Sequence, residues 1–354
     1  DCGVGNNWRG AARAEASIHT AFARIDPGNR TARLKLSRHE RATGPVVRQT
    51  RTMTHSPRFL SVDDVRERLA AHGYLASDAI ATTVFLADQL GKPLLVEGPA
   101  GVGKTALSSA VAAATASELV RLQCYEGVDE ARALYEWNHA KQLLRITAAG
   151  AHHNATGEDA AEWQEVKDDI FTDEFLLSRP LLTAIRNEHP TVLLIDELDK
   201  ADVEIEGLLL EVLSDFQVTV PELGTITASQ TPFVVLTSNA TRELSEALRR
   251  RCLYLHIDYP ESELERQIVT LTVPELEDGL ADSIVRLVGA LRQMRLRKSP
   301  SVAETIDWAR TLLSLGAEGE LDPSLVRSTL GVILKHREDI EIAEARLDLS
   351  RALA

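Results

Sequence analysis

A glycine-rich segment near residue 100 has the residue types that bind a chain of phosphates. Residues 97–110 read EGPAGVGKTALSSA, in which two glycines bracket four residues before a lysine and a threonine. Glycines let successive backbone N–H groups converge on one point, and the following helix directs its positive dipole end there. The lysine adds a mobile charge for the terminal phosphates, and the threonine hydroxyl can bind Mg²⁺. The phosphate-binding loop is therefore expected to comprise Gly98, Pro99, Ala100, Gly101, Val102, Gly103, Lys104, Thr105 and Ala106.

Two carboxylates follow an apolar run downstream of this loop. The segment TVLLIDELDK (residues 191–200) places Asp196 and Glu197 at the end of a run typical of a buried strand. Two acids at a buried strand end are costly without a cation. We therefore expect Asp196, with Thr105, to hold Mg²⁺, and Glu197 to polarise an attacking water.

Two further sets of polar residues fit the same chemistry. A second apolar run, PFVVLTSN, ends in Asn239, which is placed to hydrogen-bond the attacking water or the terminal phosphate. The segment LSEALRRRCLYL (residues 244–255) carries three consecutive arginines. Arginines at a helix C-terminus commonly complement the dipole, but one of them could also stabilise the transferring phosphoryl group on a neighbouring subunit. That role requires an oligomer.

The elements that must position these residues are visible as periodic patterns. Short continuous apolar runs alternate with helical stretches, which is typical of an α/β fold with a parallel sheet. Serines suited to N-caps begin two helices before the loop, at Ser61 and Ser77. Residues 147–169 are polar and Gly- and Ala-rich, and are interpreted as an exposed insertion or loop. The five predicted strands are residues 93–97, 118–123, 191–197, 232–239 and 252–258.

Beyond Pro260 the strands stop and apolar residues recur at three- and four-residue spacing, which predicts a second, all-helical domain. The sequence thus divides into a basic N-terminal arm (1–58), an α/β nucleotide-binding core (59–259) and a helical lid domain (260–354). Residues 1–52 carry ten Lys/Arg and four Asp/Glu without apolar periodicity, so the arm is expected to be disordered. Met53 has the context of a natural start, and residues upstream of it could be non-native.

Composition excludes several classes of protein. The 354 residues are 44% hydrophobic and 26% charged, as in ordinary globular proteins. Three cysteines without a CxxC pair argue against a disulfide framework or a thiolate metal site. Because no long apolar run and no signal-like leader occurs, we expect no membrane span and a cytoplasmic location.

The order of these motifs resembles that of AAA+ ATPases. GPAGVGKT, LLIDE, TSN and ALRRRC, followed by helices, are similar to an AAA+ core with a C-terminal lid. DEARALYEW, FLLSRPLLTAI and residues 207–239 resemble the MoxR family in particular, and the resemblance covers about residues 60–340. It implies ATP and Mg²⁺ as cofactors, a hexameric ring, and a chaperone-like role in remodelling or maturing a client protein or metalloenzyme, beside a von Willebrand factor A domain partner. By the same match Arg251 takes the arginine-finger position, with Arg250 as the alternative.

The sequence also departs from the MoxR pattern. DELDKADV stands where MoxR-like chains have DEINRAPP, and TSN replaces TQN. KSPSVA replaces a GASPRA-like segment, so Ser301 occupies the place of the sensor arginine, for which Lys298 or Arg297 could substitute. These differences indicate a divergent branch, similar to ATPases associated with carbon monoxide dehydrogenase maturation.

Three other functions use the same core. A nucleic-acid motor or loader is disfavoured by the net charge of -14 and by the lack of a basic stripe, helix-turn-helix or zinc module. A small-molecule kinase would seldom carry a helical lid or an arginine cluster placed for a neighbour. A non-hydrolysing scaffold is disfavoured by intact Glu197 and Asn239. An ATP-hydrolysing machine acting on protein remains the preferred hypothesis.

Overall fold

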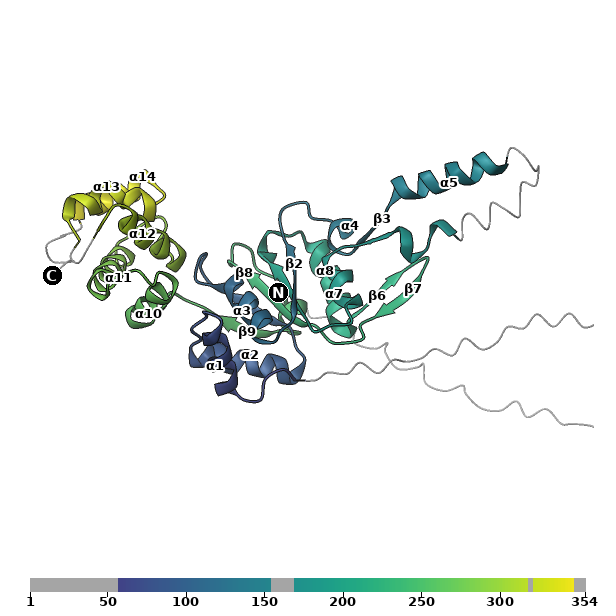
Figure 1. Cartoon of the computed structure of the whole chain (residues 1–354), viewed down its shortest axis with the longest axis horizontal. Helices are drawn as coiled ribbons and strands as arrows, with labels where there is room; N and C mark the ends of the chain where they lie inside the picture. Colours follow the sequence, from purple (N-terminus) through teal and green to yellow (C-terminus); the bar gives the residue numbers. More distant parts are fainter. Residues whose placement is uncertain (1–56, 154–168, 318–320, 347–354) are drawn as a thin grey trace, which may run out of the picture. The chain divides into compact units, whose positions relative to one another are not determined.

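A five-stranded parallel sheet forms the centre of the structure (Figure 1). The computed structural model describes residues 57–153, 169–317 and 321–346, all within one compact unit. The strand order is β2-β5-β8-β1-β9, and every neighbouring pair is parallel. The strands are β1 (Leu94–Glu97), β2 (Glu118–Gln123), β5 (Thr191–Asp196), β8 (Phe233–Ser238) and β9 (Leu253–His256). All five strands predicted from the sequence are confirmed, with ends differing by one or two residues.

Alternate residues of the strands face two separate hydrophobic clusters, which makes the core a three-layer arrangement. On one face, Val192 and Leu194 pack in a cluster with α1, α2 and α3. On the other, Leu193 and Ile195 pack in a cluster with α7 and α8. Because β5 is buried on both faces, its sequence is a continuous apolar run rather than an alternating one. These helices are α1 (Val62–Ala71), α2 (Asp78–Leu90), α3 (Lys104–Ala114), α7 (Pro180–Arg186) and α8 (Val203–Asp215).

The two helices before the phosphate loop begin at their predicted caps. The Ser61 hydroxyl accepts from the backbone N–H of Asp64, and Ser77 accepts from Ile80. α2 ends at Gly91, whose left-handed conformation (φ 59°) suits a residue without a Cβ. α1 ends at Ala71 with His72 as its C-cap, and Gly73 follows in the left-handed conformation (φ 79°).

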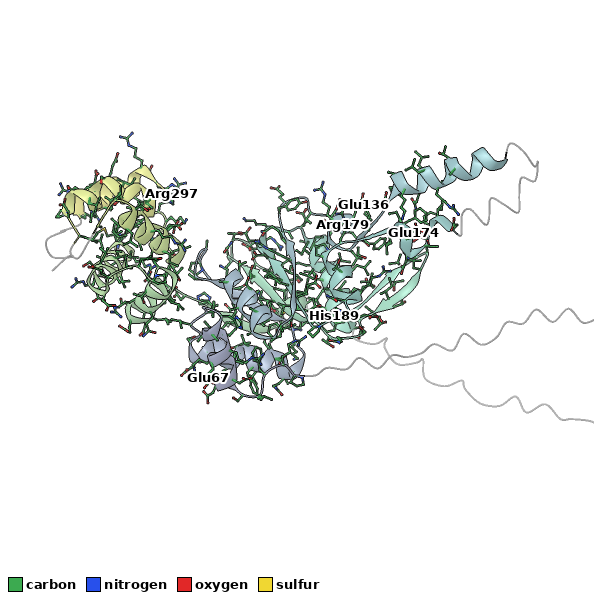
Figure 2. The ribbon with its side chains drawn as sticks, in the orientation of Figure 1. Glu67, Glu136, Glu174, Arg179, His189 and Arg297 are labelled. Atoms are coloured by element: carbon green, nitrogen blue, oxygen red, sulfur yellow. The ribbon has the colours of Figure 1, made fainter. Side chains whose placement is uncertain are left out.

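Two small antiparallel sheets and a helix interrupt the core and were not expected from the sequence. A short helix, α4 (Glu130–Ala133), precedes β3 (Tyr135–Trp137), which pairs with β4 (Leu176–Ser178); the 3-10 turn η1 (Asp173–Phe175) leads into β4. Arg179, after β4, forms an ion pair with Glu136 of β3, and both side chains are labelled in Figure 2. β6 (Gln217–Val220) and β7 (Gly224–Thr227) form a hairpin.

Between β3 and β4 lies α5 (His139–His153), which corrects the loop predicted for residues 147–169. The first part of the predicted loop, residues 147–153, is the end of this helix, which starts eight residues earlier at His139. Alanine has the highest helix propensity and no proline interrupts this stretch, so a weak apolar pattern was misleading here. Residues 154–168 lie outside the described residues.

The described part of the chain beyond residue 260 is helical, as expected. Its core includes Trp308, whose Nε1–H donates to the Thr329 hydroxyl at 2.9 Å. The boundaries of the helical domain stay a prediction, as does the basic arm, which lies outside the described residues. None of the helices that the structure describes is long and apolar enough to cross a membrane. The helices are α10 (Ser262–Thr272), α11 (Asp278–Arg292), α12 (Val302–Ser314), α13 (Pro323–Ile333) and α14 (Arg337–Arg346).

Candidate functional site

The phosphate loop joins β1 to α3, and its glycines are required by local geometry. A Cβ on Gly98 would lie 1.9 Å from the backbone oxygen of Ile257, so no side chain fits there. Gly101 and Gly103 have φ of 76° and 96°, in the left-handed region that favours glycine. Gly103 is also the N-cap of α3 and offers no side-chain cap. The first N–H groups of α3 therefore face the loop without a side-chain acceptor at the cap, as an anion site requires.

Lys104 is largely buried and turns back across the loop. Its Nζ donates to the backbone oxygens of Gly98 and Pro99, both at 2.7 Å, and to Asn239 Oδ1 at 2.8 Å. Burial lowers the pKa of Lys104 from its usual value, and the carboxylates of residues 196, 197 and 199 partly oppose this. The lysine thus already bridges the loop and the end of β8.

Asp196 is the buried centre of the site. The Thr105 hydroxyl lies 3.1 Å from its Oδ1, and the Thr237 hydroxyl also donates to Oδ1. The guanidinium of Arg121, from β2, donates to Oδ2 at 2.5 Å. Hydroxyl and carboxylate oxygens are the protein ligands that Mg²⁺ prefers, together with water and substrate phosphates. The pair of Thr105 and Asp196 therefore fits Mg²⁺.

Glu197 has an unusual backbone conformation. With φ of 56° it is one of few non-glycine residues in the left-handed region, which turns the chain sharply after β5. Its N–H donates to the Thr237 hydroxyl at 2.9 Å. Its Oε2 accepts from Gln123 Nε2 at 2.9 Å and from Lys200 Nζ at 2.6 Å. The carboxylate is therefore held by two donors.

Asn239 is positioned by a carboxylate that sequence reasoning missed. Asp199 accepts from the backbone N–H of Asn239 at 3.0 Å and of Thr241 at 3.2 Å, and also from the Thr241 hydroxyl. Burial alone would raise the pKa of Asp199, but these hydrogen bonds outweigh burial and lower it below its usual value. Asp199 therefore stays ionised and fixes the turn that carries Asn239.

Five sequence-predicted residues thus meet at the carboxyl end of the sheet. We call this set the edge cluster: Lys104, Thr105, Asp196, Glu197 and Asn239.

The three arginines, here named the arginine segment (residues 249–251), lie elsewhere. Helix α9 (Glu246–Arg249) ends at Arg249, which pairs with Glu97. Arg250 pairs with Glu246 on the surface. Arg251 is exposed, and its guanidinium donates to the Ser214 hydroxyl and the backbone oxygen of Ala247, both at 3.0 Å. The structure therefore does not bring the candidate finger to its own chain's edge cluster.

The start of α12 lies against the phosphate loop. Ser301 is its N-cap and forms a capping box with Glu304. A Cβ on Gly101 would lie 2.4 Å from the Ser301 hydroxyl, and Ala303 N–H donates to the Gly101 oxygen at 3.3 Å. Of the two possible substitutes for the sensor arginine, Lys298 pairs with Glu304 at 2.6 Å, whereas Arg297 is held through its backbone by Asp339.

The described cysteines have no role in this site. Burial, with a smaller contribution from the nearby carboxylates, raises the pKa of Cys124 to about 12, so its thiol stays neutral. Burial likewise raises the pKa of Cys252 to about 12.

Comparison with known proteins agrees with this geometry. Residues 93–252 match the family of AAA domains, dynein-related subfamily. This segment, a little under half of the chain, is therefore similar to AAA domains. AAA domains generally bind and hydrolyse ATP with Mg²⁺. The match ends at residue 252, just after the arginine segment, so it includes every residue of the edge cluster.

Relatives and solved structures match over longer parts of the chain. An uncharacterized protein of Staphylococcus haemolyticus (strain JCSC1435) is 26% identical over 233 residues, 64% of this chain and 77% of its own length. An uncharacterized protein of Staphylococcus aureus (strain NCTC 8325 / PS 47) is 25% identical over the same shares. Solved structures of Thermotoga maritima RuvB are also similar. The Holliday junction branch migration motor has a TM-score of 0.41 at 18% identity, over 83% of this chain and 80% of that one. A mutant of the same RuvB has a TM-score of 0.43 at 18% identity, over 83% and 78%.

Several site residues escaped sequence reasoning. Gln123 and Arg121 end strand β2, and β2 lies beside β5 with Gln123 in register with Asp196. The polar residues at the end of the segment ELVRLQ (118–123) were the sequence feature that could have indicated their place in the site. Thr237 and Asp199 lie within the TSN and DELDK segments, in which only Asn239, Asp196 and Glu197 were predicted as site residues.

Proposed function

We propose that this chain binds ATP with Mg²⁺ and hydrolyses it, as an AAA+ machine that remodels or matures another protein. The observation that supports this best is the convergence of the edge cluster at the carboxyl end of three adjacent strands. A cation bonded to an amide, a hydroxyl bonded to a carboxylate, and a second carboxylate next to the first in sequence match the needs of phosphoryl transfer to water.

Each residue of the edge cluster has a distinct task in this proposal. Thr105 and Asp196 would hold Mg²⁺, and the ion would supply positive charge beside the phosphate oxygens. Lys104 leaves its loop carbonyls to contact the terminal phosphates. Glu197 accepts a hydrogen bond from the attacking water, and Asn239 orients the water or the terminal phosphate.

Hydrolysis then requires several contacts to exchange partners. Arg121 donates to the Asp196 carboxylate, and Lys104 donates to Asn239. Glu197 is held by Gln123 and Lys200. We infer that nucleotide binding releases these contacts, so the arrangement is that of an enzyme before it engages its substrate.

The arginine segment supports an oligomer. Arg250 and Arg251 are exposed, and Arg251 makes only a hydroxyl and a carbonyl contact among the described residues. We propose that Arg251 completes the site of a neighbouring subunit in a hexameric ring. Arg250 is the alternative finger.

The class of substrate rests on the MoxR resemblance and on charge. A net charge of -14 with a pI near 5.2 disfavours binding to phosphate backbones. We therefore propose a client protein, a partner with a von Willebrand factor A domain, and action in the cytoplasm. The core of this machine would span residues 59–259 and its lid residues 260–354.

The decisive experiment uses the trapped form of the enzyme. The mass of the Glu197→Gln variant is measured by light scattering behind a sizing column, with and without Mg-ATP. A shift to about six subunits on ATP is expected from the ring and its trans arginine. A monomer under both conditions would remove the trans role of Arg251, and DNA-stimulated, salt-sensitive turnover of the wild type would move the substrate to nucleic acid.

A further inference from the structure

An ion pair between a buried carboxylate and a half-buried guanidinium, outside the edge cluster, joins the phosphate loop to the arginine segment. Glu97 is the last residue of β1 and directly precedes Gly98. Its carboxylate is 6% exposed and accepts from Arg249 at 2.5 Å. Arg249 is in turn the last residue of α9, two positions before Arg251. One side-chain contact thus links the first turn of the loop to the arginine segment.

The surroundings hold this pair in one geometry. The Arg249 guanidinium lies over the Tyr254 ring at 5.8 Å, on the edge strand β9. Partial burial, with a hydrogen bond to the Glu97 carboxylate, raises the pKa of the Tyr254 hydroxyl. The Arg249 Nε is buried without a hydrogen-bond partner among the described residues. A guanidinium that is only partly satisfied and clamped between a carboxylate and a ring has few alternative positions.

The three arginines therefore differ in how firmly their side chains are held. Arg250 makes an exposed pair with Glu246, with side chains 77% and 70% exposed. Such surface pairs contribute little to stability or position. Arg249 is the residue of the segment that is fixed to the sheet, and Arg251 follows it within one helical turn.

We propose that Glu97, acting through Arg249, positions Arg251 and so couples the phosphate loop of one subunit to the finger that the same subunit presents to its neighbour. This inference rests on the proposed role of Arg251. Glu97 and Arg249 are positioning residues in this proposal, because they act through Arg251. A nucleotide that moves the loop at Gly98 would shift Glu97, and Arg249 would transmit that shift to residues 250 and 251.

A double-mutant cycle tests the coupling. We expect Glu97→Gln to lower kcat about tenfold, about 1.4 kcal/mol in the barrier, with little change in KM or in the affinity for a fluorescent ATP analogue. The decisive comparison is made in the Arg251→Ala background. There Glu97→Gln should have no further effect on kcat, because its action passes through the missing arginine.

Controls separate positioning from folding. Glu246→Gln, which removes the exposed pair of Arg250, should leave kcat unchanged. Arg249→Lys keeps the charge but not the planar fork, so it should reproduce the loss of Glu97→Gln. The melting temperature of Arg249→Lys shows whether this variant is folded, and its sizing profile shows whether it assembles. Arg249→Lys serves as the test variant if Glu97→Gln fails to fold.

The outcomes are distinguishable from failure of the proposed function. Additive losses in the cycle, or weaker analogue binding with kcat unchanged, would overturn the coupling and leave Glu97 as a support of its own loop. Full turnover by Arg251→Ala alone would instead remove the finger, whatever Glu97→Gln does.

Discussion

The edge cluster and the arginine segment differ in how their charged side chains are paired. In the edge cluster, Lys104, Asp196 and Glu197 are all satisfied by groups of the same chain, several of them buried. In the arginine segment, Arg250 and Arg251 lie on the surface. Charged groups satisfied inside one chain form a site that exists before any partner arrives. Exposed arginines beside the fixed Arg249 are, in our proposal, one part of a site whose other part lies on a neighbouring subunit.

Under the proposed function, the edge cluster is complete within one chain, whereas the arginine segment acts on a neighbouring chain. Substitutions in the edge cluster should act within one subunit, whereas substitutions in the arginine segment should act on the subunit next to it. Four variants test this contrast.

The largest effect is expected from Lys104→Ala. The lysine is the cation of the phosphate loop and also bridges to Asn239, so its loss should abolish nucleotide binding and turnover. Binding of a fluorescent ATP analogue is the measurement. Lys92→Ala, at an exposed lysine just before β1, is the matched control and should bind normally. Tight binding by Lys104→Ala would mean that the loop does not hold the phosphates.

Arg251→Ala should bind nucleotide normally and lose turnover about a thousandfold, as expected of an arginine that stabilises the transferring phosphoryl group. The signature of action in trans is rescue: mixing Arg251→Ala with Lys104→Ala subunits should restore activity, because each supplies what the other lacks. Arg250→Ala is the matched variant and should keep turnover. If Arg250→Ala loses activity instead, the finger is the neighbouring residue.

Glu197→Gln should bind ATP and lower kcat by about a hundredfold or more, because an amide cannot accept the water proton. Mixing with Lys104→Ala subunits should give no rescue beyond dilution, in contrast to Arg251→Ala. Recovery on mixing would show that Glu197 also works across the interface and would break the contrast between the two regions. Single-turnover hydrolysis is the measurement.

The smallest effect is expected from Gln123→Ala. Removing the donor to Glu197 frees its carboxylate from one of two hydrogen bonds, each worth about 1 kcal/mol, so basal turnover without a partner should rise severalfold. Steady-state ATPase activity is the measurement, with Gln293→Ala, at an exposed glutamine after α11, as control. A fall in turnover would show that Gln123 aids catalysis instead of holding the carboxylate back.

Much of the fold was accessible from the sequence because burial on both faces leaves a clear pattern. The runs at 191–196 and 233–238 are buried throughout, and their middle positions are filled by apolar residues. The edge cluster followed because each of its members stands next to such a run or within the glycine loop.

The contacts that hold Glu197 and Arg249 in place could not be predicted from the sequence, because they depend on which strands become neighbours. Gln123 meets Glu197 only because β2 pairs with β5 in a particular register. Glu97 and Arg249 are 152 residues apart, and nothing local in either segment indicates the other. Residues 147–153 of α5 were missed for another reason, because their alanines favour a helix by propensity while the apolar pattern of these few residues is weak.

The close approach of Gly98 to Ile257 has a consequence for movements of the loop. The contact is made by main-chain atoms, and Ile257 N–H also donates to the Glu97 oxygen at 2.8 Å. Residue 257 begins the stretch that leads to α10. A movement of the loop at Gly98 would therefore displace residue 257 through main-chain atoms, and with it the start of the segment that leads to the helical part of the chain.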